Sequence, residues 1–212
     1  MKRAVVIGGY GESECQLEPI AEAACEAFNV NDAAIFTLVN ADKNPNALIK
    51  AVEDAAVNTH SLGVSKVPLT ANPELLMVFN GPEPHRIGSL FLSAGQIALK
   101  HAQHAIIGSN FTRNITTARD TLGQLASHPL EHLSYIPGVA NFSSTRRVAR
   151  MAESGLNVKL VAAEDDEFFA PLSYISAARK ILPRIVDLQI IPGNHTTLLR
   201  RPGEVFARTL FQ

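Results

Sequence analysis

The chain has 212 residues, 46% of them hydrophobic, and a formal net charge of −1 at pH 7. This length and composition fit one domain with a sizeable buried core, and the near-zero charge provides no long-range field that favours nucleic acid or an anionic membrane. No segment has the roughly 18 consecutive apolar residues of a membrane-spanning helix, so we expect neither a membrane span nor a nucleic-acid partner.

The two cysteines and the first residues bear on the cellular compartment. Cys15 and Cys25 fall within one predicted helical region with no ligand cluster around them, so we expect both to be reduced packing residues. Met1-Lys2-Arg3 is similar to the start of a signal peptide, but the apolar run after it breaks at Gly8-Gly9 and is too short. We therefore expect a cytoplasmic protein.

Short apolar runs alternate with helical segments along most of the chain. The runs expected to form strands are residues 4–7, 34–39, 55–59, 75–79, 158–162 and 188–191. The helices expected between and after them are residues 18–28, 45–52, 171–181 and 202–211. Strands that alternate with helices predict a parallel sheet with right-handed crossovers. In such a sheet the functional loops follow the carboxyl ends of the strands.

Residues 85–157 interrupt this alternation and are expected to be mostly helical. The helix candidates, with proline-containing turns among them, are residues 87–105, 114–125 and 145–153, and the turns are His128-Pro129 and Ile136-Pro137-Gly138. We therefore expect a core made of residues 1–84 and 158–212, with residues 85–157 as an insertion.

One five-residue stretch, Thr59-His60-Ser61-Leu62-Gly63, carries the clearest sign of chemistry. It follows a predicted strand and begins a short helix that ends before Pro68. A serine in a sharp turn between strand and helix presents its hydroxyl above the sheet. An acid, Asp166, and a histidine, His195, each follow a later predicted strand. All three side chains therefore fall at the carboxyl ends of strands, where we expect the loops to meet.

Five loops of the chain, taken together, resemble those of the α/β hydrolases. Residues 8–13 resemble the oxyanion loop of that family, residues 59–63 its nucleophile elbow, residues 80–84 the loop that carries a cap domain, residues 163–171 its Gly-x-x-Asp loop, and residues 192–195 its Gly-x-His loop. The order Ser, Asp, His along the chain is also the order of that family. The resemblance implies the α/β class and the α/β-hydrolase fold, with a mostly parallel six-stranded sheet flanked by helices, a helical cap insertion at 85–157, and the family's first two strands absent. Two positions depart from the pattern, since Thr59 replaces the first glycine of the elbow and Gly8 replaces the histidine of the oxyanion loop.

The resemblance also implies a reaction and a role for each residue. The protein would be a serine esterase-type hydrolase that cleaves a carboxylic ester or thioester through an acyl-enzyme. Ser61 would be the nucleophile, His195 the base that takes its proton, and Asp166 the acid that orients the imidazole. The backbone N–H groups of Tyr10 and Leu62 would form the oxyanion hole, where one donor typically contributes about 3 kcal/mol.

The expected partner is a small-molecule acyl substrate, held between the strand ends and the insertion. Phe168, Phe169 and Tyr10 are candidate lining residues of this pocket. No metal and no organic cofactor is required, and an amide or a carbon–carbon bond is also compatible with the same groups.

Several residues compete for these roles. Phe91-Leu92-Ser93-Ala94-Gly95 is a second elbow-like stretch, but Ser93 falls on the polar side of a helical pattern. Asp165 is an alternative acid to Asp166. His60 is expected to point into the packing of the elbow rather than to act as the base. His101 and His104 are spaced as metal ligands on a helix could be, but no carboxylate or cysteine set joins them.

Two other functional classes stay open at this point. Gly9 and Gly11 match the first two glycines of a dinucleotide-binding fingerprint, which would make the protein a nicotinamide-dependent oxidoreductase. The third glycine is replaced by Glu14, and the candidate acid Asp32 lies before the second predicted strand rather than at its end. The other class is a noncatalytic binding protein with the same fold, because a fold does not fix its chemistry.

Overall fold

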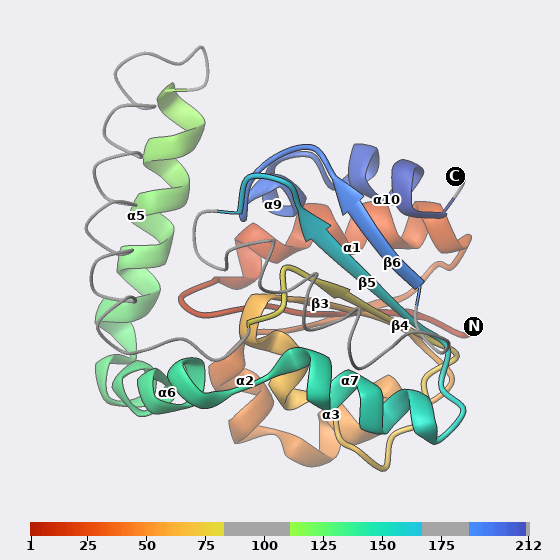
Figure 1. Ribbon diagram of the computed structural model, residues 1–212. Coiled ribbons are helices and arrows are strands. Elements are labelled where there is room, and N and C mark those ends of the chain that lie inside the picture. Colours follow the sequence, from red (N-terminus) through yellow and green to blue (C-terminus); the bar gives the residue numbers. More distant parts are fainter. Residues whose placement is uncertain (83–110, 167–186, 211–212) are drawn as a thin grey trace.

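Six parallel strands form one sheet in the computed structural model, which describes residues 1–82, 111–166 and 187–210 (Figure 1). The strands are β1 (Ala4–Ile7), β2 (Ala33–Phe36), β3 (Ala56–His60), β4 (Leu75–Phe79), β5 (Val158–Ala163) and β6 (Asp187–Ile191). Their order across the sheet is β2-β1-β3-β4-β5-β6, and every neighbouring pair is parallel. The predicted six-stranded parallel sheet is therefore confirmed.

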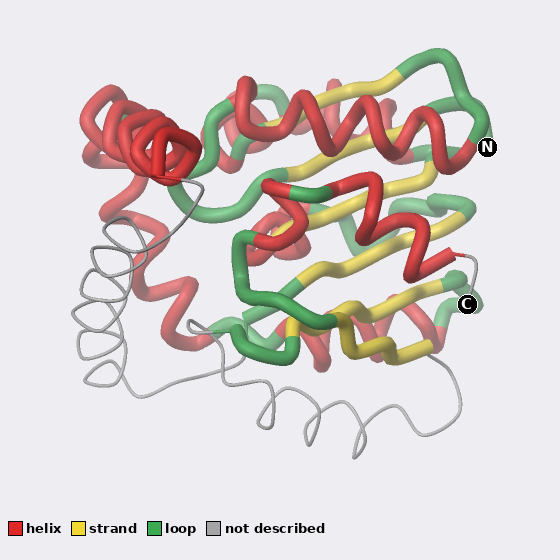
Figure 2. Tube along the Cα trace, turned by 90° about the horizontal axis from the view of Figure 1, so that it is seen from above, coloured by secondary structure: helices red, strands yellow, loops and turns green. Residues whose placement is uncertain are grey.

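Helices cover both faces of this sheet (Figure 2). One face carries α1 (Glu14–Phe28), α9 (Thr197–Arg200) and α10 (Pro202–Leu210), and the other carries α2 (Leu38–Lys43), α3 (Pro45–Val52) and α7 (Ser144–Glu153). Successive side chains of a strand point to opposite faces, so Val5 and Ile7 join one apolar cluster while Ala4 and Val6 join the other. Both faces of the sheet are thereby buried, as is usual for parallel sheets.

Two boundaries differ from the predictions because local capping decides them. The second strand was expected to reach Val39, but it ends at Phe36 because Thr37 caps α2, with its Oγ1 accepting the N–H of Asn40 at 3.1 Å. The first helix was expected at residue 18, but it begins at Glu14 after Ser13, whose N–H donates to Oε1 of Gln16 at 2.8 Å. The predicted strand ended three residues too late, and the predicted helix began four residues too late.

Two helices of the predicted insertion lie beside the carboxyl-terminal edge of the sheet. They are α5 (Phe111–Ser127) and α6 (Pro129–Asn141). The turn predicted at Ile136-Pro137-Gly138 was wrong, because α6 continues through it; an interior proline costs a helix one hydrogen bond but does not always end it. The predicted elements at 87–105 and 171–181 lie outside the described residues, as do Ser93, His101, His104, Phe168 and Phe169.

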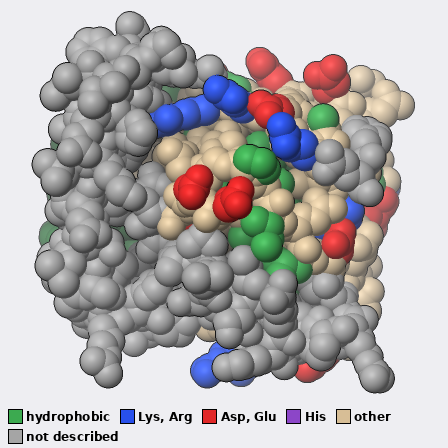
Figure 3. All heavy atoms as spheres, turned by 45° about the horizontal axis from the view of Figure 1, so that its top comes forward, with side chains coloured by type: hydrophobic (Ala, Val, Ile, Leu, Met, Phe, Trp, Pro, Cys, Tyr) green, Lys and Arg blue, Asp and Glu red, His purple; other side chains and the backbone are tan. Residues whose placement is uncertain are grey.

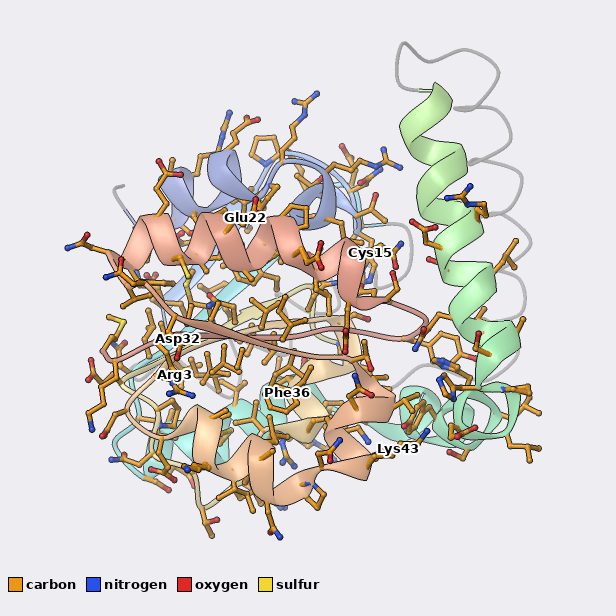
Figure 4. The ribbon with its side chains drawn as sticks, turned by 180° about the vertical axis from the view of Figure 1, so that it is seen from behind. Arg3, Cys15, Glu22, Asp32, Phe36 and Lys43 are labelled. Carbon is orange, nitrogen blue, oxygen red and sulfur yellow. The ribbon has the colours of Figure 1, made fainter. Side chains whose placement is uncertain are left out.

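Side chains from the core hold these two helices. At the start of α1, Nε2 of Gln16 donates to Oγ1 of Thr121 in α5 at 3.2 Å. The hydroxyl of Tyr135 in α6 donates to Oδ2 of Asp42 in α2 at 2.6 Å, and Nζ of Lys66 lies 4.6 Å from the centre of the Tyr135 ring. Lys43, labelled in Figure 4 at the end of α2, lies 3.7 Å from a carboxylate oxygen of Glu131 in α6.

The chain returns from the insertion to the core at the point where it left. The N–H of Ser144, the first residue of α7, donates to the carbonyl oxygen of Pro82 at 2.9 Å. From there α7 packs on the sheet, with Val148 and Met151 fully buried in the core. The expected insertion ran to residue 157, and α7 within that range contributes to the core.

Candidate active site

Ser61 occupies a strained turn between β3 and a short 3₁₀ helix, η1 (Ser61–Lys66). Its φ of 50° lies in the left-handed region, which a serine adopts rarely, and residues strained in this way are concentrated at active sites. The residue is only 6% exposed. This is the conformation expected of a serine that must leave the strand direction abruptly at the end of a sheet.

Glycine is required at position 63 by the close approach of η1 to β1. A Cβ on Gly63 would collide with the carbonyl oxygen of Ile7 and would lie 2.8 Å from that of Gly8. Position 59, in contrast, tolerates a side chain because it still belongs to β3. Thr59 is fully buried there and donates its hydroxyl hydrogen to the carbonyl oxygen of Met77 at 3.3 Å.

The glycine loop after β1 passes directly beside Ser61. A Cβ on Gly9 would lie 2.6 Å from the Cβ of Ser61, so only a glycine allows this approach. Tyr10 and Leu62, the two residues expected to form the oxyanion hole, directly follow Gly9 and Ser61 in the chain. The Tyr10 ring packs edge-on against His132 of α6, with 5.1 Å between ring centres, and burial raises the pKa of its phenol.

Asp166 and His195 meet across the loops that follow β5 and β6. Both side chains are buried, and Nδ1 of His195 donates to Oδ2 of Asp166 at 2.8 Å. Backbone hydrogen bonds join the two loops, because the N–H of Asp165 donates to the carbonyl of Gly193 at 2.8 Å. The side chains of Glu164 and Asp165 are exposed, as expected of loop residues that face water.

The backbone carbonyl of His195 is held by two donors from the neighbouring strand ends. Nε2 of His60 donates to it at 2.8 Å, and Nδ2 of Asn80 donates to it at 3.0 Å. Oδ1 of Asn80 in turn accepts the N–H of Ala163 at 2.8 Å. The residue before Ser61 is therefore in direct contact with His195, so the loops after β3, β4, β5 and β6 converge at one place.

His60 has a second buried partner, which is Glu12. One carboxylate oxygen of Glu12 hydrogen-bonds Nδ1 of His60, and the other accepts the N–H of Gly9 at 2.6 Å. Burial lowers the pKa of His60, but the charge and hydrogen bond of Glu12 and the carbonyl of His195 outweigh it, so the pKa is raised above its usual value. Sequence reasoning predicted a packed His60 and missed Glu12 and Asn80 altogether.

The comparisons with known proteins bear on the fold. No family model matches the chain, and no curated protein matches it in sequence. A carboxylesterase of the thaumarchaeon Nitrososphaera gargenis has a TM-score of 0.65 and 12% identity, with 98% of this chain and 88% of that chain covered. MGS-M2, an alpha/beta hydrolase enzyme from a Medee basin deep-sea metagenome library, has a TM-score of 0.65 and 11% identity, over 99% and 88% of the two chains. The thioesterase domain from the curacin biosynthetic pathway has a TM-score of 0.61 and 11% identity, over 99% and 91%.

The chain has the α/β-hydrolase fold. In this hydrolase fold, Ser61 begins η1 directly after β3, Asp166 follows β5 and His195 follows β6, so all three lie at the carboxyl edge of the sheet. The geometry brings Asp166 and His195 into contact and connects Ser61 to them through its neighbour His60.

Neither a group of metal-ligating side chains nor a membrane-spanning helix is found in the described part of the chain. Within residues 1–82, 111–166 and 187–210, no three His, Cys, Asp or Glu side chains are grouped as they would be around a metal ion. No helix in those ranges is both long and apolar enough to cross a membrane. Where described atoms reach the surface in Figure 3, charges of both signs are interspersed with hydrophobic side chains.

Proposed function

We propose that the protein is a serine hydrolase that cleaves a carboxylic ester or thioester through an acyl-enzyme. The observation that carries this proposal is the buried Asp166–His195 hydrogen bond, which His60 connects to Ser61, a serine with a φ of 50°. A histidine whose Nδ1 is engaged by a carboxylate has Nε2 as its remaining basic atom. A serine hydroxyl needs such a base to become a useful nucleophile at neutral pH.

The reaction would run in two halves. In the first, Oγ of Ser61 attacks the substrate carbonyl carbon, its proton passes to Nε2 of His195, and Asp166 stabilises the imidazolium. The tetrahedral oxyanion accepts hydrogen bonds from the N–H groups of Tyr10 and Leu62. Collapse of this intermediate breaks the bond to the alcohol or thiol, which leaves with the proton from His195. In the second half water attacks the acyl-enzyme by the same route, and the carboxylic acid is released.

The structural neighbours favour an ester or thioester over an amide or a carbon–carbon bond. Two of the neighbours reported above are a carboxylesterase and a thioesterase domain. The small-molecule acyl substrate would lie between the strand ends and the helices α5 and α6. His132 of α6 contacts Tyr10 of the oxyanion loop. Phe168 and Phe169 remain candidate lining residues of this pocket. The two free cysteines fit the reducing interior of a cell, and we propose a cytoplasmic location.

The dinucleotide-binding alternative is disfavoured by the position of its acid. Asp32 precedes β2 and pairs with Arg3 at 3.2 Å, at the end of the sheet opposite to Ser61 (Figure 4). A ribose-binding acid belongs at the carboxyl end of the second strand. A noncatalytic binding protein with this fold is distinguished from the hydrolase by activity alone.

A fluorophosphonate probe tests the proposal directly, because it reacts with an activated serine. The wild-type protein should become labelled, and Ser61→Ala should abolish labelling. Ser65→Ala is the matched control, since Ser65 lies on the same 3₁₀ helix and should label as wild type. Labelling that persists in Ser61→Ala and disappears in Ser93→Ala would show that the elbow has been assigned to the wrong serine. A panel of p-nitrophenyl esters of graded chain length then defines the acyl group.

A further inference from the structure

Glu12 and His60 form a buried polar pair that the proposed reaction does not use. His60 is 1% exposed and Glu12 is 7% exposed. The His60 ring lies 4.7 Å from the His195 ring, centre to centre. Burying a carboxyl group and an imidazole costs free energy unless each is hydrogen-bonded. A hydrogen-bonded pair at this position therefore calls for an explanation other than packing.

The hydrogen bonds fix the protonation of the His60 ring on one side. A carbonyl oxygen can only accept, so Nε2 of His60 carries a proton toward the carbonyl of His195. One further proton is shared between Nδ1 of His60 and the carboxyl group of Glu12. Whether that proton resides on nitrogen or on oxygen, both hydrogen bonds of the ring persist. The orientation of the His60 ring therefore does not depend on whether His60 or Glu12 holds this proton.

The same pair reaches the oxyanion loop. The second carboxylate oxygen of Glu12 accepts the N–H of Gly9, the residue that passes beside Ser61. A continuous chain of hydrogen bonds thus runs from Gly9 through Glu12 and His60 to the carbonyl of His195. It connects the two loops that carry the expected base, His195, and an expected oxyanion-hole donor, Tyr10.

We propose that Glu12 and His60 are positioning residues that set His195 and the oxyanion loop relative to Ser61. This inference rests on the proposed function, because it assigns no reaction to the pair itself. The pair would fix the position of His195 and would not contact the substrate, so its loss should lower kcat more than it changes KM. A displacement of about 1 Å at a reacting group can reduce the rate about 100-fold.

The test is the hydrolysis of p-nitrophenyl butyrate by variants of the full-length chain. His60→Leu has a similar volume but donates no hydrogen bond, and we expect kcat to fall roughly 10- to 100-fold with KM within about threefold. His60→Gln can place an amide N–H where Nε2 lies, and we expect it to recover at least half of that loss on a logarithmic scale. Glu12→Gln keeps an acceptor for Gly9 and a donor for Nδ1, and should stay within about fivefold of wild type.

A matched control separates positioning from loss of stability. Thr209→Val removes another fully buried hydrogen-bonding group, whose hydroxyl donates to carbonyl oxygens of Val205 and Phe206 within its own helix α10, and should leave kcat unchanged. If His60→Leu does not fold, the same comparison is made between His60→Asn, whose shorter amide can satisfy only one of the two partners, and His60→Gln. Equal kcat in the apolar or shortened variant and in wild type refutes the inference, as does an equal loss in His60→Gln.

The fluorophosphonate probe distinguishes the two possible failures. Labelling that depends on Ser61, combined with unaltered kcat in the His60 variants, would support the hydrolase proposal and refute the positioning role of Glu12 and His60. If the wild-type protein neither becomes labelled nor hydrolyses esters, both the hydrolase proposal and the positioning role are refuted.

Discussion

The substitution Asp166→Asn tests the central contact of the site with almost no change in shape. In the wild type a carboxylate accepts from Nδ1 of His195 at 2.8 Å, and both side chains are buried, at 3% and 8% exposure. Water therefore cannot replace the lost charge. An amide NH₂ facing Nδ1 would force the ring proton onto Nε2, the atom that must accept the proton of Ser61. The corresponding change in a well-known serine protease lowers kcat about 10⁴-fold, and we expect a loss of roughly 10³- to 10⁴-fold here.

This loss corresponds to roughly 4–5.5 kcal/mol of transition-state stabilisation, at about 1.36 kcal/mol for each factor of ten. It should appear in kcat at neutral pH, with KM nearly unchanged because Asp166 would touch the histidine and not the substrate. The assay is initial-rate hydrolysis of a p-nitrophenyl ester after each variant has been shown to be folded. Asp165→Asn, one residue earlier and exposed, is the control and should retain full activity. The assignment is refuted if Asp166→Asn keeps more than about a tenth of wild-type activity, or if Asp165→Asn is the variant that loses it.

Three more perturbations address the elbow, the buried pair and the attachment of the insertion. Gly63→Ala forces a methyl group against the carbonyl oxygens at the end of β1, so we expect chemical denaturation to show a loss of roughly 1–3 kcal/mol; Gly123→Ala in α5, where nothing lies within 4 Å, should show none. The pKa of His60 is raised in the folded protein above its unfolded value of about 6.5. The stabilisation of the folded state by protonated His60 is therefore fully present below about pH 6.5 and is lost as the pH rises through the folded pKa. The difference in unfolding free energy between wild type and His60→Gln should accordingly shrink above about pH 6.5, and a difference that stays constant with pH contradicts the shift. Tyr135→Phe removes the 2.6 Å hydrogen bond to Asp42, which should destabilise the docking of α6 by roughly 1 kcal/mol and make amide hydrogen exchange in α6 faster. Unchanged exchange would mean that this bond does not hold the helix.

Much of this architecture could be predicted because it follows from local patterns of apolar and polar residues. The apolar run before Ser61 and the runs before Asp166 and His195 each predicted a buried strand, and parallel strands bring their carboxyl ends to one edge. The three residues could therefore be grouped from the sequence, although they are far apart along the chain. The distance between Asp166 and His195 could not be predicted, because it depends on how the loops after β5 and β6 join.

The contacts that escaped prediction are those between residues with no local pattern. Glu12 and His60 are 48 positions apart, and His60 and His195 are 135 positions apart. A buried histidine in an apolar neighbourhood looks the same in sequence whether it is packed or hydrogen-bonded. Asn80 was assigned to a loop, and nothing in its neighbours indicated that its amide would join the ends of two other strands. At Thr37 the apolar pair after it favoured a longer strand, while a single capping hydrogen bond favoured a helix.

The hydrogen bond between Pro82 and Ser144 has a consequence for how this molecule could change over time or in the laboratory. Because the two ends of this segment touch, its length does not change the distance between the core elements that it joins. The entropic cost of closing such a loop grows only slowly with the number of residues in it. The stretch between these residues can thus be shortened, lengthened or exchanged for another of unrelated sequence while the six strands keep their register. New substrate preferences could then arise by grafting at this junction, with the residues Ser61, Asp166 and His195 themselves unchanged.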